Sequence, residues 1–449
     1  MQKRSRTRKR TSILNPESEA IQLTKPFRVL LPNGVTILGE KLPFVESVAV
    51  GVWINVGSRD EKSAENGITH LTEHMVFKGT EHFSGSEIVD SIEGRGGYIN
   101  AFTTKEFSCY YAKVFREDLQ QAIGVLADLV RYPVFDEKDL STERKVVLSE
   151  LHEVLDDPED WGMDYIEEKL FEGNPLSMPV IGKTASINGF KAADLLKFHA
   201  RNFTPDKVVI SAVGNFDRRL FVDLVSTYFS SMAQHGNLSK RKKPVQKAPG
   251  RYTVRRLAGR QAHILLAAPA PGMDGQDRFA AAMVGVIIGD GSSSRLYKSV
   301  REKEGIAYSI YSYGSSYVDV GIMGVYAGTS VKDLKRAEEK IYSTIDEFSS
   351  VGPTADEVSR AKYQLKAGIV FSLENPWDRA SLFARDELCY GEKANVAESL
   401  ELIERVKPAE IADAAAAYFS RDRITTLLIL PNQPAVGKMT GRINRTYRR

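Results

Sequence analysis

Cysteine is scarce in this sequence: only Cys109 and Cys389 occur among 449 residues, and neither has a second thiol nearby. A disulfide framework and a C-x-x-C metal or redox pair are therefore not indicated, which favours a reducing compartment. Long apolar runs are also missing, since no stretch approaches the roughly 20 residues that a membrane-spanning helix needs. The basic start "MQKRSRTRKR" lacks the apolar segment of a secretory signal.

What the chain does contain is typical of a globular protein, and its length predicts two or more domains. The net charge of +3 is unevenly distributed, because residues 1–10 alone carry six positive side chains. We expect residues 1–25 to form a disordered basic tail, and an organellar transit peptide is the alternative. A nucleic-acid-binding function would depend on this tail and a basic linker alone, without a recognised motif. No nucleic-acid partner is therefore expected.

Residues 235–250, "HGNLSKRKKPVQKAPG", form the clearest linker because they are polar, basic and contain two prolines. They separate a predicted N-terminal domain, residues 26–234, from a predicted C-terminal domain, residues 251–449. The two parts look like repeats: "YYAKVFREDLQQAIGVLADLV" in the first resembles "VYAGTSVKDLKRAEEKIYSTI" in the second. In both segments the end of a strand is followed by an Asp-Leu pair and then by an amphipathic helix. This shared order predicts an internal duplication.

Short alternating runs such as "VAVGVWINVG" and "KVVISAVGNF" are typical of strands. Longer runs with a 3.6-residue period, such as "REDLQQAIGVLADLV", are typical of amphipathic helices. Strands and helices are mixed without strict alternation. The sequence therefore predicts an α+β fold in each half, with helices packed on one face of a largely antiparallel sheet.

His70, Glu73 and His74 in "HLTEH" follow the spacing i, i+3, i+4, so a helix would place all three side chains on one face. Two imidazoles one turn apart can hold zinc, and the carboxylate between them can act as a general base on water. The motif is short enough to occur by chance. A solvated helix face with hydrogen-bonded histidines is the structural alternative.

A catalytic zinc site needs a third protein ligand, and the segment "STERKVVLSELHEVLDDPED" offers carboxylates for it. Glu143 and Glu150 lie two helical turns apart on a stripe shared with valines, where carboxylates need partners. Ion pairs with Arg144 or Lys145 are the alternative, although those side chains fall on another helix face. The residues alone do not choose between Glu143, Glu150 and Glu153 as the ligand.

The repeat provides an internal comparison. An alignment of the two copies places Arg360 opposite Glu143 and Ala367 opposite Glu150, and the second copy contains no H-x-x-E-H. One copy keeps the histidines and acids while the other does without them. This difference is expected if these residues serve chemistry rather than the fold.

The H-x-x-E-H helix, the glutamates of "ERKVVLSEL", the segment "GGYINAFTTKE" and the later "SSRLYKSVREKEGIAYS" together resemble the M16 (pitrilysin-type) zinc peptidases, the inverzincins. The resemblance is closest to the processing-peptidase branch, which includes the mitochondrial processing peptidase β subunit and bacterial homologues. It extends in order from Pro26 to Pro431.

The resemblance implies one Zn²⁺ per chain, with His70, His74 and Glu150 as its ligands. It implies Glu73 as the base that activates water and Glu143 as a supporting acid. The choice of Glu150 over the other carboxylates comes from the resemblance.

Substrate-binding residues are also implied. In the family, the strand that matches "GGYINAFTTKE" lies at a sheet edge, where Asn100, Ala101 and Phe102 would bind an extended peptide through the backbone. An ordinary buried strand is the alternative. Arg301 and Tyr308 match a pair that reaches the active site from the second domain, to grip a peptide carbonyl and to stabilise the oxyanion. A surface ion pair is the alternative for Arg301.

The segment "DDPEDWGMD" is typical of a helix start, with Asp157 as the cap and Pro158 at the first helical position. Asp160 and Asp164 lie one turn apart and close to the Glu150 helix. They are therefore also candidates for an acidic subsite that binds a basic substrate residue. Both interpretations stay open.

We thus expect a zinc-dependent endopeptidase of two homologous α+β domains that face each other as a clamshell. Its substrates would be peptides or presequence-like extended segments. A noncatalytic scaffold subunit of the respiratory core-protein type is the alternative. The resemblance implies a homodimer or a heterodimer with an inactive paralogue. It also implies a bacterial-type cytoplasmic location, or the mitochondrial matrix as the alternative, and no membrane span.

Overall fold

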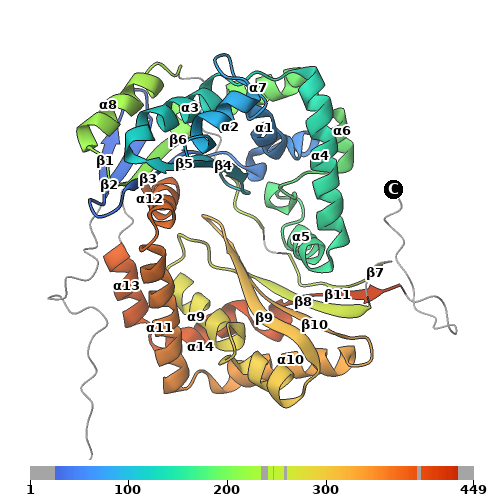
Figure 1. Ribbon diagram of the computed structural model, residues 1–449. Coiled ribbons are helices and arrows are strands. Elements are labelled where there is room, and N and C mark those ends of the chain that lie inside the picture. The colour runs from blue at the N-terminus through green and yellow to red at the C-terminus, as the bar shows by residue number, and fades with distance from the viewer. Residues whose placement is uncertain (1–25, 234–240, 246, 257–259, 392–395, 433–449) are drawn as a thin grey trace, which may run out of the picture.

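The computed structural model describes residues 26–233, 241–245, 247–256, 260–391 and 396–432. The predicted basic tail and much of the predicted linker lie outside the described residues. Figure 1 shows two sheets that stand apart from each other, with most helices on their outer faces. No helix in the described part of the chain is both long enough and apolar enough to cross a bilayer.

The first sheet has six strands in the order β1-β2-β6-β3-β5-β4, and all neighbours are antiparallel except β2 and β6. Strand β4 therefore lies at one edge of the sheet. The strands are β1 (Phe27–Leu30), β2 (Thr36–Lys41), β3 (Ser47–Ile54), β4 (Tyr98–Thr103), β5 (Ser108–Phe115) and β6 (Val208–Gly214).

The second sheet has five strands in the order β7-β11-β8-β10-β9, and all neighbours are antiparallel except β7 and β11. Strand β9 lies at one edge. The strands are β7 (Arg251–Arg256), β8 (Gln261–Ala270), β9 (Ala307–Ser316), β10 (Gly321–Ser330) and β11 (Thr425–Pro431). The predicted fold class is confirmed.

The helices complete each half. Those before the linker are α1 (Ile68–Val76), α2 (Gly85–Glu93), α3 (Leu119–Arg131), α4 (Glu137–Asp156), α5 (Pro158–Leu170), α6 (Thr184–Gly189), α7 (Ala192–Asn202) and α8 (Arg218–Phe229). Those after it are α9 (Arg278–Gly289), α10 (Leu334–Val351), α11 (Ala355–Ser372), α12 (Pro376–Tyr390), α13 (Val396–Arg405) and α14 (Pro408–Tyr418). The order β5-α3-α4-α5 recurs as β10-α10-α11-α12, as the duplication predicts.

Alternation along β3 divides its side chains between two cores. Val48, Val50, Val52 and Ile54 face the helix-covered side and pack with apolar residues of α1 and α3. Trp53 points to the other face, where it packs with residues of α12. Both faces of this strand are therefore buried, and the second face is covered by a helix from the other half of the chain.

The two halves exchange one helix each. Helix α12 lies across β6 and β3 of the first sheet, where Trp377 stacks on Trp53 and Tyr111 with ring centroids 5.4 and 3.9 Å apart. Helix α5 lies across β8 and β11 of the second sheet and packs Ile166 and Leu170 against it. Both helices lie between the two sheets in Figure 1. One face of each sheet is therefore covered by a helix from the other half. The domain boundaries stay a prediction.

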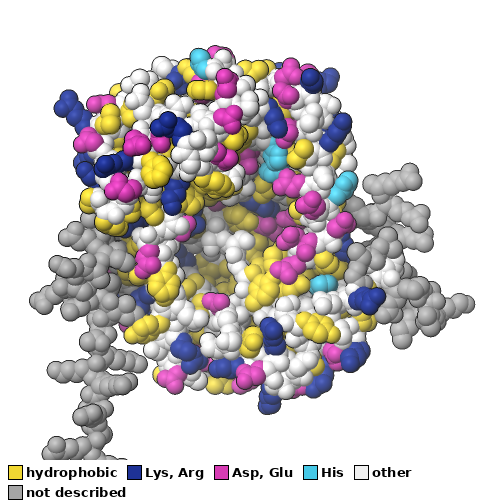
Figure 2. All heavy atoms as spheres, in the orientation of Figure 1, with side chains coloured by type: hydrophobic (Ala, Val, Ile, Leu, Met, Phe, Trp, Pro, Cys, Tyr) yellow, Lys and Arg dark blue, Asp and Glu magenta, His cyan; other side chains and the backbone are white. Residues whose placement is uncertain are grey.

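Figure 2 shows a hollow between the two halves, with acidic side chains gathered over α4 and α5 beside it. Ion pairs tie α12 to the first sheet at the far side of this hollow. Arg379 donates to Glu40 at 2.7 Å, and both side chains are buried. Arg28 and Glu387 form a second pair at 2.9 Å. The arrangement is a clamshell whose halves are joined by exchanged helices.

Candidate metal centre

Helix α1 presents its polar face to α4 and β4. Its apolar side chains, among them Ile68, Leu71 and Met75, are buried in the core of the first half. The helical spacing then turns His70, Glu73 and His74 to the opposite face, as the sequence predicts. The core packing of α1 thus fixes the direction of all three polar side chains.

The structure brings His70, His74 and Glu150 together. Their ligand atoms lie within 4.8 Å of one another, and this is the one such group among the described residues. Glu150 Oε2 lies 3.8 Å from His70 Nε2 and 3.6 Å from His74 Nε2. This oxygen is buried without a hydrogen-bond partner in the described part of the chain. A cation bound between the two imidazoles would satisfy it, so the donor set fits zinc.

The protonation state of His70 also suits a metal ligand. Burial, and to a lesser degree the neighbouring His74, lower the pKa of His70 to about 4. The imidazole is therefore neutral at neutral pH, which is the form that binds metals. The structural alternative, a solvated face with hydrogen-bonded histidines, does not hold for His70, because its Nδ1 is buried and has no hydrogen-bond partner among the described residues.

Glu143 supports the second histidine. Its Oε2 lies 3.2 Å from His74 Nδ1, and its Oε1 lies 2.6 Å from Lys78 Nζ. The carboxylate is buried, so Lys78 compensates its charge. Arg144, the alternative partner from the sequence, instead donates to the Ile187 and Phe190 carbonyls. Sequence reasoning missed Lys78, although it follows His74 by one helical turn.

Glu73 lies beside the edge strand. The Thr103 hydroxyl at the end of β4 donates a hydrogen bond to Glu73 Oε2. Burial raises the pKa of the Glu73 carboxyl, and this hydrogen bond opposes the rise. Sequence reasoning also missed Thr103, and its place at the end of the predicted strand was the only signal. The contact sets the candidate base next to the place where a strand-like peptide could add to β4.

Asn100, Ala101 and Phe102 occupy the middle of β4 and pair with β5 on one side. No other strand pairs with β4 in the described sheet. Asn100 turns its side-chain oxygen to the Ala101 N–H at 2.8 Å. In the described sheet, β4 is thus an edge strand beside Glu73 that is only partly buried, although the Ala101 N–H is already bonded to the Asn100 side chain.

The start of α5 agrees with the predicted cap, because Asp157 accepts hydrogen bonds from the Glu159 and Asp160 N–H groups. Asp160 is exposed, while burial raises the pKa of Asp164 to about 6. Lys105, in the turn after β4, attracts Asp164 and forms an ion pair with Glu167 at 3.0 Å. The acids of α5 thus lie near the end of β4.

Arg301 and Tyr308 belong to the second half. Arg301 is exposed in the π-helix Tyr297–Lys303 and lies over the Tyr297 ring at 5.1 Å. Tyr308 is 61% exposed near the start of the edge strand β9. Among the described residues, no hydrogen bond or ion pair joins either side chain to α1 or α4. The surface ion pair considered for Arg301 is also absent from the described contacts.

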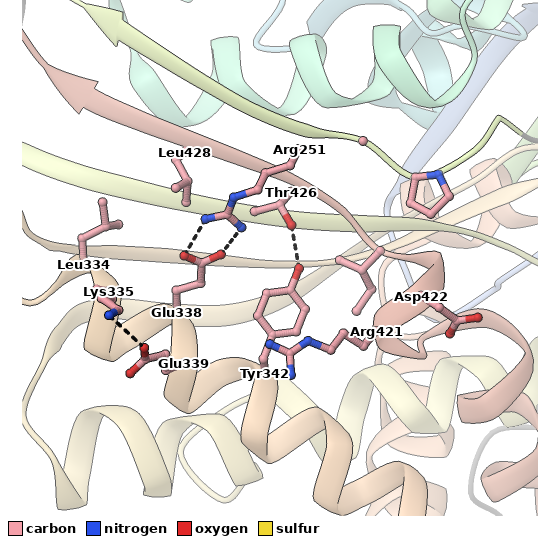
Figure 3. Close-up of a pocket in the computed structure, with 13 residues that line it drawn as sticks. Arg251, Leu334, Lys335, Glu338, Glu339, Tyr342, Arg421, Asp422, Thr426 and Leu428 are labelled. Carbon is pink, nitrogen blue, oxygen red and sulfur yellow. Dashed lines mark hydrogen bonds and ion pairs between the residues drawn. The ribbon is translucent and has the colours of Figure 1, made fainter. Parts of the chain in front are cut away.

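A cavity of about 740 Å³ lies elsewhere, between α10 and the strands β7 and β11, on the face of the second sheet opposite to α5. Figure 3 shows Arg251 turned toward Glu338 and Lys335 turned toward Glu339, while Asp422 lies apart. Arg251 donates to Glu338 through its two terminal guanidinium nitrogens, and Tyr342 shares a 2.6 Å hydrogen bond with Thr426. These four side chains are therefore bonded to one another in pairs.

Comparisons with known proteins identify the family. The family described as Insulinase (Peptidase family M16) matches residues 36–184, and the family described as Peptidase M16 inactive domain matches residues 189–365. An uncharacterized zinc protease of Streptomyces coelicolor is 36% identical over 402 residues, which cover 88% of this chain and 87% of that protein. The uncharacterized zinc protease YmxG of Bacillus subtilis is 34% identical over 401 residues, covering 89% and 97%.

Solved structures share the fold. A protease from Helicobacter pylori superposes with a TM-score of 0.84 at 23% identity, covering 91% of this chain and 100% of that one. A chain of Complex III2 from Candida albicans reaches a TM-score of 0.78 at 22% identity, covering 90% and 95%. At these identities the likeness shows the two-domain fold and nothing about activity.

Proposed function

The chain belongs to the M16 family of peptidases, whose cofactor is zinc, and we propose that it is an endopeptidase that cleaves peptides bound in extended form. The observation that carries the proposal is the convergence of His70, His74 and Glu150, with Glu73 on the same helix face and a free strand edge beside it. His70, His74 and Glu150 would hold the metal. Bound zinc would supply a Lewis acid that polarises the peptide carbonyl and lowers the pKa of water.

The side chains around the metal have separate tasks in the proposed reaction. Glu73 takes a proton from water as the water oxygen attacks the carbonyl carbon. It then passes this proton to the amide nitrogen as the C–N bond breaks. Glu143 holds the His74 ring through Nδ1, which keeps Nε2 directed at the metal position.

The substrate would lie as an added strand on β4. Main-chain hydrogen bonds along Asn100, Ala101 and Phe102, from the groups that face away from β5, would hold a peptide without regard to its side chains, so the site suits unfolded segments. Arg301 and Tyr308 would act from the second half, where Tyr308 donates to the oxyanion formed by water attack. The hollow between the halves limits the substrate to chains that can enter it extended.

Basic segments are the favoured substrates. Asp160 and Asp164 provide negative charge near the end of β4, where a lysine or arginine of a bound peptide would pass. Presequence-like peptides, which are rich in such residues, fit this charge. The exposed position of Asp160 and the partial burial of Asp164 leave both open to a substrate side chain.

A noncatalytic scaffold role finds less support, although a respiratory-complex chain shares the fold. A scaffold has no use for a buried, unpartnered carboxylate oxygen between two imidazoles, which costs free energy unless a cation binds. The proposed assembly is a homodimer or a heterodimer with an inactive paralogue, and the proposed location is cytoplasmic or in the mitochondrial matrix.

The test is cleavage of an unstructured basic peptide by the full chain before and after metal removal. Cleavage at internal bonds, its loss with a chelator and its return with added zinc are expected. A rate that persists after complete metal removal would contradict the proposal. Cleavage only at the ends of the peptide would contradict the proposal that the protein is an endopeptidase.

A further inference from the structure

Three consecutive charged residues precede the histidine helix, and the proposed function leaves them without a role. Arg59, Asp60 and Glu61 follow β3 in a tight turn that includes the short helix Ser58–Asp60. Arg59 and Glu61 are each only 4% exposed. Buried charges require partners, and the partners of these three lie in three different parts of the molecule.

Glu61 serves as the N-terminal cap of α1 from a distance. Its Oε1 accepts the Thr69 N–H at 2.8 Å, and its Oε2 accepts the Gly67 N–H at 2.9 Å and the Asn66 side-chain amide at 3.1 Å. The first N–H groups of a helix lack intrahelical partners, and negative charge there is favoured by the helix dipole. Thr69 directly precedes His70, so this cap acts on the turn that carries a proposed ligand.

The residue at the start of α1 cannot supply the cap itself. Gly67 has a φ of 92°, and a Cβ added to it would lie 2.7 Å from the Gly182 Cα. The position therefore excludes a side chain both by its backbone conformation and by the close approach of the second backbone segment. The acceptor for the first turn has to come from elsewhere in the chain, and Glu61 provides it.

Arg59 and Asp60 connect the same turn to the rest of the molecule. Arg59 binds Asp319, in the turn between β9 and β10, through two hydrogen bonds of 2.8 and 2.7 Å. It also donates to Glu106 at 2.6 Å. Asp60 accepts from the Arg241 guanidinium at 2.9 and 2.7 Å. The hairpin of the second half and the chain that leads to it are thus both anchored next to Glu61.

We propose that Glu61 is a positioning residue for the metal centre, and that Arg59 and Asp60 make its position depend on the docked second half. Without the Glu61 carboxylate, the N–H groups of Gly67 and Thr69 lose their acceptor and the first turn of α1 loosens around His70. Without Asp319, the turn that carries Glu61 loses its direct contact with the hairpin of the second half. The inference rests on the proposed function only in that zinc binds at His70, His74 and Glu150.

The test is the zinc dissociation constant of the full chain, measured by competition with a chelator. Glu61→Gln keeps the size of the side chain but sets an amide NH₂ against a backbone N–H, and it should raise the constant by about 10-fold or more, as is typical for supporting residues. Asp319→Asn should raise it by less. The double variant should match Glu61→Gln alone, because both changes act through one turn.

Two matched controls separate positioning from general destabilisation. Glu357→Gln removes a carboxylate that caps α11 in the second half, where it accepts the Thr354 N–H and pairs with Arg295. Arg28→Gln breaks a different ion pair between the halves, with Glu387. Both controls should bind zinc as the natural chain does.

An unchanged zinc dissociation constant in Glu61→Gln would overturn the inference. A rise of the same size in the control Glu357→Gln would overturn it as well. If the zinc dissociation constant of the double variant rises by the product of the two single increases, the two changes act independently. That result would overturn the link to the second half. If Glu61→Gln does not fold, Asp319→Asn carries the test alone, and an unchanged constant there contradicts the proposal. A chain that binds zinc but cleaves no peptide would contradict the proposed function instead, because the readout here is affinity.

Discussion

At the scale of single residues, the candidate centre extends beyond the side chains that the sequence singles out. The spacing of His70, Glu73 and His74 predicts a shared helix face, because helical geometry is local. The contacts of Lys78, Thr103 and Glu61 depend on which elements meet in space, and local patterns place at most the residue and not its partner. Sequence reasoning therefore missed these three residues, while the helical spacing found His70, Glu73 and His74 and the family resemblance added Glu143 and Glu150.

Lys78 should affect the metal centre although it touches no proposed ligand. Its ammonium group compensates the charge of the buried Glu143, which in turn holds His74. Lys78→Met should weaken zinc binding by about 10-fold, as expected for a supporting residue, when measured by chelator competition. Lys62→Met, which breaks only an exposed pair with Glu65, is the control and should change nothing. Equal zinc affinity in Lys78→Met and the natural chain would remove Lys78 from this role.

Asp164 should make substrate preference depend on pH. Burial raises its pKa to about 6, so the carboxylate is charged above that pH and neutral below it. The ratio of kcat/KM for matched arginine and alanine peptides should therefore be high near pH 8 and fall as the pH drops through about 6. The ratio cancels the pH dependence of the metal centre, which both peptides share.

Asp164→Asn should give a low ratio without this pH dependence. Asp160→Asn should lower the ratio further in combination, because both carboxylates belong to the proposed subsite. A ratio in the natural chain that stays constant over the whole range would leave Asp160 and Asp164 with their helix-start role alone.

At the scale of elements, the sequence predicts the helices and strands better than their partners. The Asp157 cap, the amphipathic helices and the β5-α3-α4 order of the repeat were all readable, since they depend on local spacing. The sequence did not predict that α5 and α12 each pack on the sheet of the other half. An apolar stripe shows that a helix face is buried, but both sheets offer an apolar face that would cover it.

Removal of Trp377 should destabilise the first half, although the residue belongs to the second. Its ring stacks on Trp53 and Tyr111, so Trp377→Ala leaves a cavity on the inner face of the first sheet. We expect a loss of about 3 kcal/mol in the free energy of unfolding, measured in urea. Phe371→Ala, at a 66% exposed position on α11, is the control and should change it by less than about 0.5 kcal/mol. Equal effects of the two substitutions would show that α12 does not stabilise the first sheet.

At the scale of the whole molecule, the internal repeat predicts two related halves, and the structure has two related sheets. The repeat does not predict how the halves meet. Their docking depends on single contacts such as Arg59 with Asp319, which lie 260 positions apart in the chain. Such pairs have no signature in one sequence, so the contacts that join the halves became visible only in the structure, whereas the clamshell with its hollow was expected from the family resemblance.

The second half should contribute to turnover without contributing to metal binding. If Tyr308 donates a hydrogen bond to the oxyanion, Tyr308→Phe should lower kcat by about 10²- to 10³-fold, with zinc content unchanged. Tyr363→Phe, which alters a 52% exposed tyrosine on α11, is the control and should leave kcat as it is. An unchanged kcat in Tyr308→Phe would place the oxyanion stabilisation within the first half.

The central claim is that one site both binds zinc and hydrolyses peptides, with different residues for the two tasks. The direct measurement is zinc content and turnover on the same preparations of the natural chain, Glu73→Gln and Glu150→Gln. Glu73→Gln should retain stoichiometric zinc and lose turnover by about 10²- to 10⁴-fold, since only the general base is removed. Glu150→Gln should lose zinc as well, because it removes a proposed ligand. Full turnover in Glu73→Gln, or full zinc in Glu150→Gln, would contradict the account.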